Sequence, residues 1–323
     1  MSLAAARRWL HDAWILHVVP YLPSRLPWRL AWPCYRLFAR SASLYPEPVS
    51  AALAHAPAQL PIGDLAAFAR DVRSVWLFDA ADLHLSRRHP PGWLPEHVKV
   101  RGQWPTGAFV AASFHYGTGL WIFSDLRRNG HESVFVSGRF DQADFARHPL
   151  RYRHGMARMA ELERLGGQAV AFRPGIRPRL RDALAAGHVV VSLLDVPPRL
   201  APHGQHPARL LDRAASLPEG MLKIAAEAGV PIVPCWIEID FDRGERTLVI
   251  GAPIAPEPIE AALAQLAQLL DSLIRKQPAA WLFWAEWPAW QRDAAALHGA
   301  PTFSNVAAEG SLSGQRIEQG LQE

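Results

Sequence analysis

The chain has 323 residues, of which half are hydrophobic and a fifth are charged, with a net charge of +4. This length is sufficient to bury a full hydrophobic core in one large domain or two smaller ones. Two cysteines exclude a disulfide framework and are typical of a protein from a reducing compartment. Thirteen tryptophans are a high number, and because tryptophan favours positions with one apolar and one wet edge, they point to a membrane or lipid-facing surface.

Residues 1–95 are predicted to be a helical subdomain, from the apolar spacing in residues 24–45 and 65–85. Within residues 1–40, arginine, tryptophan and leucine alternate between prolines, a pattern typical of helices that lie on a bilayer surface. The alternative is a helical cap packed on the protein's own core. No apolar run of about 18 residues occurs, so neither a spanning helix nor a secretory signal is predicted.

Residues 96–292 are predicted to form an α/β domain, with a mostly parallel central sheet flanked by helices. Two short strands around a turn are expected at 98–102 and 107–113. Later strands are expected at 133–138, 168–172, 188–195, 230–241 and 246–254, the last antiparallel to the one before it. Helices are expected at 120–130, 156–167, 177–187, 218–229 and 259–278, a loop at 196–213, and a loosely ordered tail at 293–323.

Several classes of function are excluded by their missing motifs. The sequence lacks GxGxxG after a strand, GxxxxGK[ST] and GxSxG, so nucleotide-binding and serine-hydrolase sites are not predicted. His203 and His206 in a proline-rich loop have no nearby third ligand, and no metal site is predicted. Residues 139–181 contain ten arginines and four acidic residues, which favours either a solvated helical face or a cradle for an anionic partner. Nucleic acid is not expected, because this segment lacks interleaved aromatic residues.

His115 is the strongest single candidate for chemistry. It follows the apolar run GAFVAAS, at the carboxyl end of a predicted strand, where open α/β sheets bind their ligands. Gly117 and Gly119 would let backbone or ligand come close. A neutral imidazole in this position can take a proton from an acceptor hydroxyl, although a lone histidine at a strand end is more often structural.

The run AASFHYGTGLW resembles the histidine motif of the bacterial lipid A late acyltransferases, the lauroyl and myristoyl acyltransferases within the glycerolipid acyltransferase superfamily. The resemblance extends over residues 30–292. It includes VFVSGRF, whose arginine is Arg139, and HVVVSLLDVPP, whose Asp195 matches the aspartate of an L-x-D-Q segment. It also includes VPIVPCWIEID and the tryptophan-rich AAWLFWAEWPAW, which lacks the family's usual histidine and basic residues.

The resemblance implies a glycerolipid acyltransferase-like fold and a set of site residues. His115, Asp195 and Arg139 are expected to be catalytic. Arg173, Arg177, Gly117 and Leu120 are expected to bind substrate, with Arg139 and Arg173 contacting an oxyanion or an acceptor phosphate. Turn amides near Gly117 are expected to donate to the oxyanion, and Leu120 is expected to line the acyl channel.

The family motif has an acid five residues after its histidine, and this sequence has Leu120 there. Three explanations are open. His115 is oriented by a backbone carbonyl or by a distant acid such as Asp195. Alternatively, the acceptor is an amine or phenol that needs a weaker base. In the third, catalysis has been lost.

The expected function is transfer of an acyl chain from an acyl carrier protein or coenzyme A thioester to a hydroxyl or amine of a lipid or glycolipid. The expected location is peripheral, on the cytoplasmic face of a bacterial inner membrane. No cofactor is expected beyond the thioester substrate. The alternatives are a catalytically silent protein that binds a lipid or an acyl carrier protein, and a thioester hydrolase.

Overall fold

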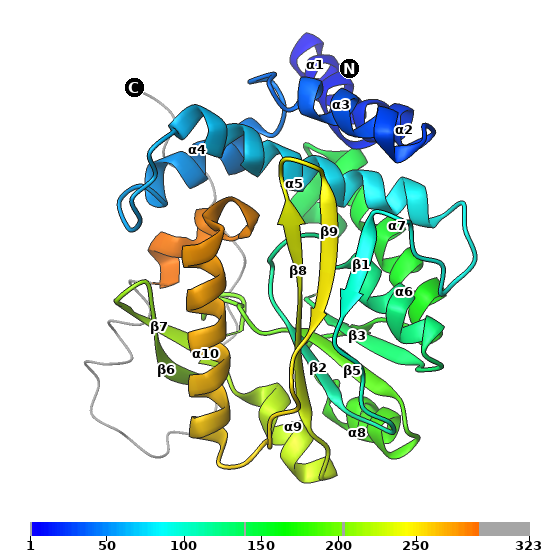
Figure 1. The fold of residues 1–323 in the computed structure, drawn as a ribbon, viewed down its shortest axis with the longest axis vertical. Helices are drawn as coiled ribbons and strands as arrows, with labels where there is room; N and C mark the ends of the chain where they lie inside the picture. Colours follow the sequence, from blue (N-terminus) through cyan, green and yellow to red (C-terminus); the bar gives the residue numbers. More distant parts are fainter. Residues whose placement is uncertain (1, 139, 202–203, 291–323) are drawn as a thin grey trace.

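The computed structural model describes residues 2–138, 140–201 and 204–290. Helices fill the chain before the first strand, in agreement with the predicted helical N-terminal region (Figure 1). They are α1 (Leu3–Ala13), α2 (Val19–Ser24), α3 (Trp28–Phe38), α4 (Pro46–His55) and α5 (Leu65–Ser86), with a π-helical turn at Trp14–Val18 between α1 and α2. Asp64 begins α5 by accepting hydrogen bonds from the backbone amides of Ala66 and Ala67.

Seven of the strands in the described residues form one mixed sheet. These are β1 (Val98–Arg101), β2 (Val110–Ser113), β3 (Ser133–Ser137), β4 (Ala171–Phe172), β5 (Val189–Leu193), β8 (Ile232–Asp240) and β9 (Glu245–Ile250). Their spatial order is β1-β9-β8-β2-β5-β3-β4. All neighbours are parallel except β8 and β9, so the predicted mostly parallel sheet and its antiparallel partner strand are confirmed. The two strands expected around a turn, β1 and β2, do not pair with each other.

Both faces of the sheet are covered, which explains why its central strands are apolar throughout. All four residues of β2 are buried. Because side chains alternate along a strand, Ala111 packs into one core cluster with α6 (Leu120–Arg128) and α7 (Pro149–Gly166). Val110 and Ala112 pack into the other, with α8 (Arg177–Ala185), α9 (Gly220–Ala228) and α10 (Ile259–Lys276).

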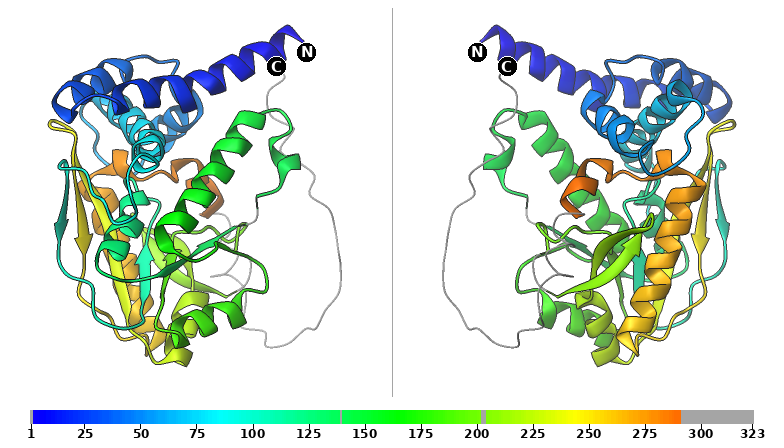
Figure 2. Two further views of the ribbon diagram at one scale, coloured as in Figure 1. Left: turned by 90° about the vertical axis from the view of Figure 1, so that its right-hand side faces the viewer. Right: turned by 90° about the vertical axis from the view of Figure 1, so that its left-hand side faces the viewer.

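The N-terminal helices share these cores and do not form a separate one. Val75 and Phe78 of α5 belong to the same cluster as Phe109, just before β2. Figure 2 shows α1, in dark blue, along the edge of the molecule and next to the first turns of α7. The α/β part is therefore capped by the helices at the end of the molecule where α7 begins.

One expected loop is wrong. Residues 196–213 were expected to be irregular, but β6 (Gln205–Leu210) and β7 (Arg213–Pro218) form an antiparallel hairpin. Leu211 and Asp212 make its two-residue turn, both at positive φ. The hairpin packs against α10 and buries Leu210, Ala215 and Leu217 there. The predicted tail at 293–323 lies outside the described residues.

Candidate active site

His115 lies in a tight turn between β2 and α6. The amide of Gly117 donates to the carbonyl of Ala280 at 2.9 Å, and the carbonyl of His115 accepts from the amide of Leu282 at 2.8 Å. Gly117 has φ of 68°, and a Cβ there would lie 2.4 Å from the carbonyl oxygen of Ile237. Only glycine fits this backbone conformation and this spacing, so the turn fixes the position of His115 between the sheet and the segment at 279–282.

Asp195 supplies the acid that the sequence motif lacks. Strands β2 and β5 are adjacent, with Ser113 opposite Leu193, so the residues that follow them meet at the carboxyl edge of the sheet. Asp195 is completely buried, and its Oδ1 lies 2.9 Å from Nδ1 of His115. The backbone amide of His115 also donates to both carboxylate oxygens, at 2.8 and 2.9 Å. The geometry agrees with the first of the three explanations, in which Asp195 orients His115.

A tryptophan completes the surroundings of the buried carboxylate. Nε1 of Trp281 donates to Oδ2 of Asp195 at 3.0 Å. The carboxylate thus accepts hydrogen bonds from the His115 backbone, the imidazole and the indole. A buried charge needs such hydrogen bonds to offset its loss of hydration. Trp281 belongs to the tryptophan-rich segment singled out in the sequence, but nothing in that segment indicated which tryptophan faces Asp195.

The contact with Asp195 leaves Nε2 of His115 as the ring nitrogen that can accept a proton. A carboxylate accepts hydrogen bonds, so the proton is assigned to Nδ1 and Nε2 carries the lone pair. Phe283 stacks on the ring with centroids 3.7 Å apart and planes 16° apart. The side chain of His115 retains about 24% of its exposure, so Nε2 has access to a ligand only from a restricted direction.

Leu120 is the first residue of α6 and is fully buried in the core with Phe78 and Phe109. A carboxylate at this position would be desolvated among apolar side chains, which is the physical reason that an acid there is incompatible with this packing. Because Leu120 has no exposed surface, its predicted contact with an acyl chain finds no support in the structure. Ser124 and Asp125, further along α6, bond to the Trp93 carbonyl and the Trp104 indole and do not replace it.

Two of the predicted arginines line a cavity of about 550 Å³ at the carboxyl edge of the same sheet. Arg173 directly follows β4 and is partly buried, and burial lowers its pKa with no carboxylate opposing the shift. Arg177 begins α8 and forms an ion pair with Glu227 of α9. The third predicted arginine, Arg139, lies outside the described residues, as does His203.

The rest of this cavity is mainly apolar. Its walls come from the ends of β3 and β5 and from the first turns of α8 and α9, and include Val136, Leu193, Leu200, Ala201, Met221 and Ile224. The amides at the start of two nine-residue helices, together with Arg173, favour an anionic group at one end of an apolar ligand. The cavity therefore fits an amphipathic anion, a class to which acyl donors and phospholipids belong.

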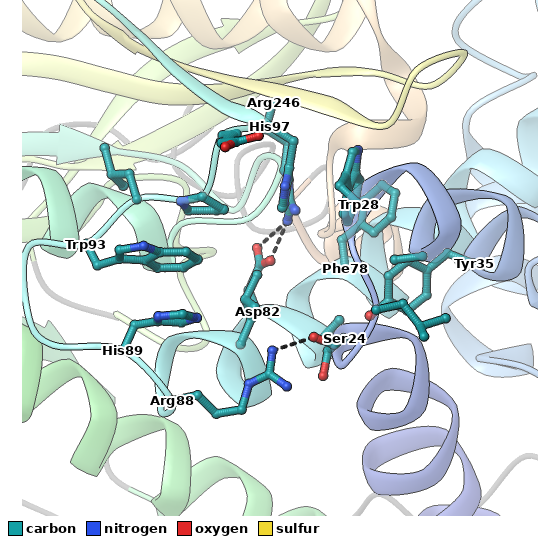
Figure 3. Close-up of a pocket in the computed structure, with 17 residues that line it drawn as sticks. Ser24, Trp28, Tyr35, Phe78, Asp82, Arg88, His89, Trp93, His97 and Arg246 are labelled. Carbon is teal, nitrogen blue, oxygen red and sulfur yellow. Dashed lines mark hydrogen bonds and ion pairs between the residues drawn. The ribbon is translucent and has the colours of Figure 1, made fainter.

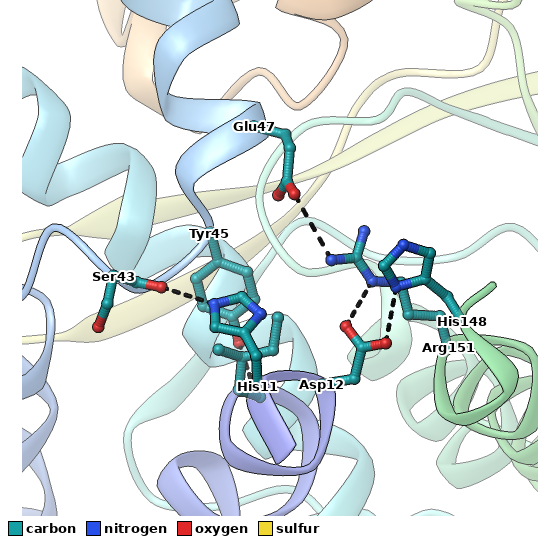
Figure 4. Close-up of polar contacts among 8 residues, drawn as sticks. His11, Asp12, Ser43, Tyr45, Glu47, His148 and Arg151 are labelled. Atoms are coloured by element: carbon teal, nitrogen blue, oxygen red, sulfur yellow. Dashed lines mark hydrogen bonds and ion pairs between the residues drawn. The ribbon is translucent and has the colours of Figure 1, made fainter. Parts of the chain in front are cut away.

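A second cavity, of about 360 Å³, is lined by the 282–286 segment and by residues of the N-terminal helices. Phe283, Leu282, Ile15 and Trp76 provide apolar walls. Glu47 and Arg151 also line it, and Figure 4 shows Arg151 in contact with Glu47 and with Asp12.

Asp12 also accepts from Nδ1 of His148 at 2.8 Å, a second buried carboxylate–imidazole pair that fastens α1 to the start of α7 (Figure 4). Next to it, Nε2 of His11 contacts the carbonyl of Ser43, which ties α1 to the chain before α4. These contacts hold the N-terminal helices over the second cavity.

The exposed apolar side chains are concentrated at the N-terminus. Among the described residues, the exposed large hydrophobic side chains outside the first 37 residues are Leu65 and Leu200. The others are Leu3, Trp9, Leu10, Trp14, Val18, Tyr21, Leu22, Leu26, Leu30 and Leu37. A concentration of this kind marks an interaction surface, here called the N-terminal apolar surface.

In the described part of the chain, no group of three or more histidine, cysteine or acidic residues is arranged to hold a metal ion. No described helix is both long and apolar enough to cross a bilayer. No protein-family model and no curated protein sequence matches the chain.

Proposed function

We propose that this chain is a membrane-surface acyltransferase that moves an acyl group from a thioester to a hydroxyl or amine of a lipid or glycolipid. The observation that carries the proposal is the contact between Asp195 and Nδ1 of His115. This contact gives His115 an orienting acid. The family's acid is absent from position 120, which was the main argument against catalysis. The proposal keeps the resemblance to lipid A late acyltransferases as its family assignment.

In the proposed reaction, Nε2 of His115 removes the proton from the acceptor hydroxyl as the oxygen attacks the thioester carbonyl. The Asp195 carboxylate stabilises the imidazolium that forms, as an orienting carboxylate does in other histidine-based sites. The tetrahedral oxyanion then collapses, the carbon–sulfur bond breaks, and the imidazolium returns the proton to the leaving thiolate. One ester bond forms and one thioester bond breaks, and His115 ends in its starting protonation state.

The oxyanion needs hydrogen-bond donors that are not already engaged. The amide of Gly117 is bonded to Ala280 and that of His115 to Asp195, so these two amides do not serve. Arg173 has no carboxylate partner in the described residues, so its guanidinium is the predicted donor that is not already engaged by an acid. The cavity of about 550 Å³, which Ser192 and Leu193 of β5 line together with Arg173, would take the acyl chain, with the anionic part of the donor or acceptor near Arg173.

Two further features support the partners in the proposal. The N-terminal apolar surface suits peripheral attachment to a bilayer, and the resemblance places it on the cytoplasmic face of a bacterial inner membrane. Within the arginine-rich segment at 139–181, Arg151, Arg158 and Arg164 are in ion pairs with acids of the chain. The phosphates of coenzyme A or an acidic acyl carrier protein would therefore bind at arginines without such partners, such as Arg173. No cofactor is required.

The test uses the purified full-length chain with a panel of acyl carrier protein and coenzyme A thioesters, with and without membrane lipid extract. Mass spectrometry follows loss of the thioester and appearance of an acylated lipid. His115→Ala is expected to abolish turnover. His148→Ala is the matched control, because His148 also contacts a buried aspartate but lies at the start of α7.

Lipid-dependent turnover that requires His115 and not His148 supports an acyltransferase. Turnover that requires His115 but releases free acid without any lipid acceptor identifies a thioester hydrolase. Equal, negligible turnover in all three proteins, with a lipid or carrier protein retained, contradicts the enzyme and leaves a binding protein.

A further inference from the structure

A third cavity lies away from His115, between the N-terminal helices and the chain that follows α5 (Figure 3). Its volume is about 330 Å³, and its walls include the aromatic rings of Trp28, Tyr35, Phe78 and Trp93. Leu26 also lines it and is 44% exposed as part of the N-terminal apolar surface. The cavity is therefore continuous with the surface proposed to rest on the bilayer.

The cavity wall carries buried polar atoms without partners. Nε of Arg246, Nε2 of His97 and Nε1 of Trp28 make no hydrogen bond with any described residue. Arg246 and His97 are 1% and 8% exposed, and all three atoms have almost no solvent-accessible surface, so bulk water does not satisfy them. Buried polar groups are nearly always satisfied. Because Nε of Arg246 and Nε1 of Trp28 are donors, these unsatisfied groups indicate a ligand that supplies hydrogen-bond acceptors.

The charges around the cavity select the kind of acceptor. Asp82 and Arg246 form a completely buried ion pair and cancel each other (Figure 3). Arg88 donates to the carbonyl of Ser24 and has no acidic partner among the described residues. The remaining lining acid, Glu96, is exposed, so solvent screens it. An anionic group near Arg88 is thus favoured.

A cationic headgroup is disfavoured by the same walls. The guanidinium of Arg246 lies 5.2 Å from the ring centre of Trp28 and 5.1 Å from that of Phe78. His97 stacks on Trp28 with centroids 3.6 Å apart. The aromatic faces that would bind a quaternary ammonium group therefore already hold a cation and an imidazole.

We infer that this cavity binds the phosphate diester of an anionic membrane phospholipid, with Arg88 at the charged oxygens and Trp28, His97 and Arg246 completing their hydrogen bonds. The acyl chains would leave the cavity past Leu26 into the bilayer. This inference rests on the membrane-surface part of the proposed function, but not on acyl transfer. It describes a headgroup site separate from the cavity at Arg173.

Calorimetric titration of the full-length chain with dihexanoyl phosphatidylglycerol, kept below its micelle concentration, tests the site without a charged surface. Arg88→Gln is expected to weaken binding about tenfold or more, as for loss of a charge-assisted hydrogen bond. Arg87→Gln is the matched control, since Arg87 donates to the carbonyl of Ala157 and does not line the cavity. It is expected to leave affinity unchanged.

Trp28→Phe keeps the ring and removes the indole donor, and is expected to weaken binding about fivefold. Dihexanoyl phosphatidylcholine is expected to bind at least tenfold more weakly than phosphatidylglycerol, because its charge is balanced. Absence of phosphatidylglycerol binding, or an equal effect of Arg87→Gln and Arg88→Gln, overturns the inference. Inorganic phosphate that binds as tightly as the lipid also overturns it, since the site would then be one for free phosphate.

The acyl-transfer proposal and the phospholipid-binding proposal can be tested independently of each other. His115→Ala is expected to bind dihexanoyl phosphatidylglycerol with unchanged affinity while losing acyl transfer. Loss of lipid binding in Arg88→Gln with acyl transfer retained assigns the cavity to lipid attachment. Lipid binding in a wild-type protein that transfers no acyl group contradicts the enzyme and leaves the headgroup site in place.

Discussion

Two histidines in this molecule have nearly the same contact with an aromatic ring and opposite electrostatic surroundings. His115 stacks on Phe283 at 3.7 Å, and His97 stacks on Trp28 at 3.6 Å. His115 has a buried carboxylate at Nδ1. His97 has the Arg246 guanidinium nearby, and burial together with that cation lowers its pKa to about 2.

The comparison shows that burial and the neighbouring charge together, rather than the residue type or the ring stacking, decide what each histidine does. An imidazole beside a carboxylate can take up a proton during a reaction, because the resulting cation is stabilised in place. An imidazole beside a guanidinium stays neutral throughout the physiological range and serves as a packing and hydrogen-bonding group. His115 therefore belongs to a chemical site, and His97 to a binding or structural one.

The largest effect is expected when the carboxylate charge next to His115 is removed. Asp195→Asn is expected to lower the rate of acyl transfer about 10³- to 10⁴-fold, because the amide no longer fixes the tautomer or stabilises the imidazolium; the upper figure is that of the serine-protease triad. Mass-spectrometric turnover measures it. Leu120→Asp in the same protein is not expected to restore activity, since that position lies in the core. Restoration would show that the motif acid still works from position 120.

A side chain at Gly117, in the turn that holds His115, is expected to have the next largest effect. Gly117→Ala places a Cβ against the Ile237 carbonyl at a positive φ, and is expected to lower the free energy of unfolding by about 3 kcal/mol. Urea denaturation measures this. Gly107→Ala is the control, because Gly107 also has a positive φ but no atom within 4 Å of the added Cβ. It is expected to lower stability by about 1 kcal/mol. Equal losses would show that backbone strain alone explains the effect.

Removing one hydrogen bond from the Asp195 carboxylate is expected to have a smaller effect. Trp281→Phe keeps the aromatic packing but leaves Oδ2 of Asp195 without its indole donor. We expect kcat to fall about tenfold with KM nearly unchanged, in line with one lost hydrogen bond to a charged group. Trp284→Phe, whose indole donates to the Pro278 carbonyl, is the matched control. An equal fall in both variants would assign the effect to packing.

The smallest effect concerns His97 and depends on pH. Its pKa is about 2 when folded and near 6.5 when unfolded, so below pH 6.5 the unfolded chain binds a proton that the folded chain does not. This contribution is present above pH 6.5 and is lost as the pH falls, by about 1.4 kcal/mol per pH unit. In His97→Phe, the free energy of unfolding is expected to fall less steeply between pH 6.5 and 5.5. Identical slopes would show that folding does not lower the pKa of His97.

Much of the architecture follows from local sequence patterns. The apolar runs that become β2, β5 and β8 are flanked by amphipathic helices, and this alternation predicts a parallel sheet covered on both faces. The helix predicted at 156–167 is confirmed as the second part of α7, ended by Gly167 at a positive φ. The hairpin at β6 and β7 was missed, because its prolines and histidines hide the alternation that a strand normally shows.

The position of His115 at a strand end and the identity of Asp195 as a candidate partner were also available from the sequence. Trp281 and Phe283 were not, because they lie more than 160 residues away and only tertiary packing brings them to the imidazole. Leu120 shows the opposite case. Its sequence position suggests a site, and its packing places it wholly in the core.

By itself, the sequence determined the α/β class, the helical N-terminus and a histidine at the carboxyl edge of the sheet, because these depend on periodicity and on residues close together in the chain. The tertiary structure alone decided which acid reaches that histidine and which arginine stands beside His97. The reason is physical: the energy of a charge in a protein depends on distances of a few ångströms between segments far apart in sequence, and only the folded chain sets those distances.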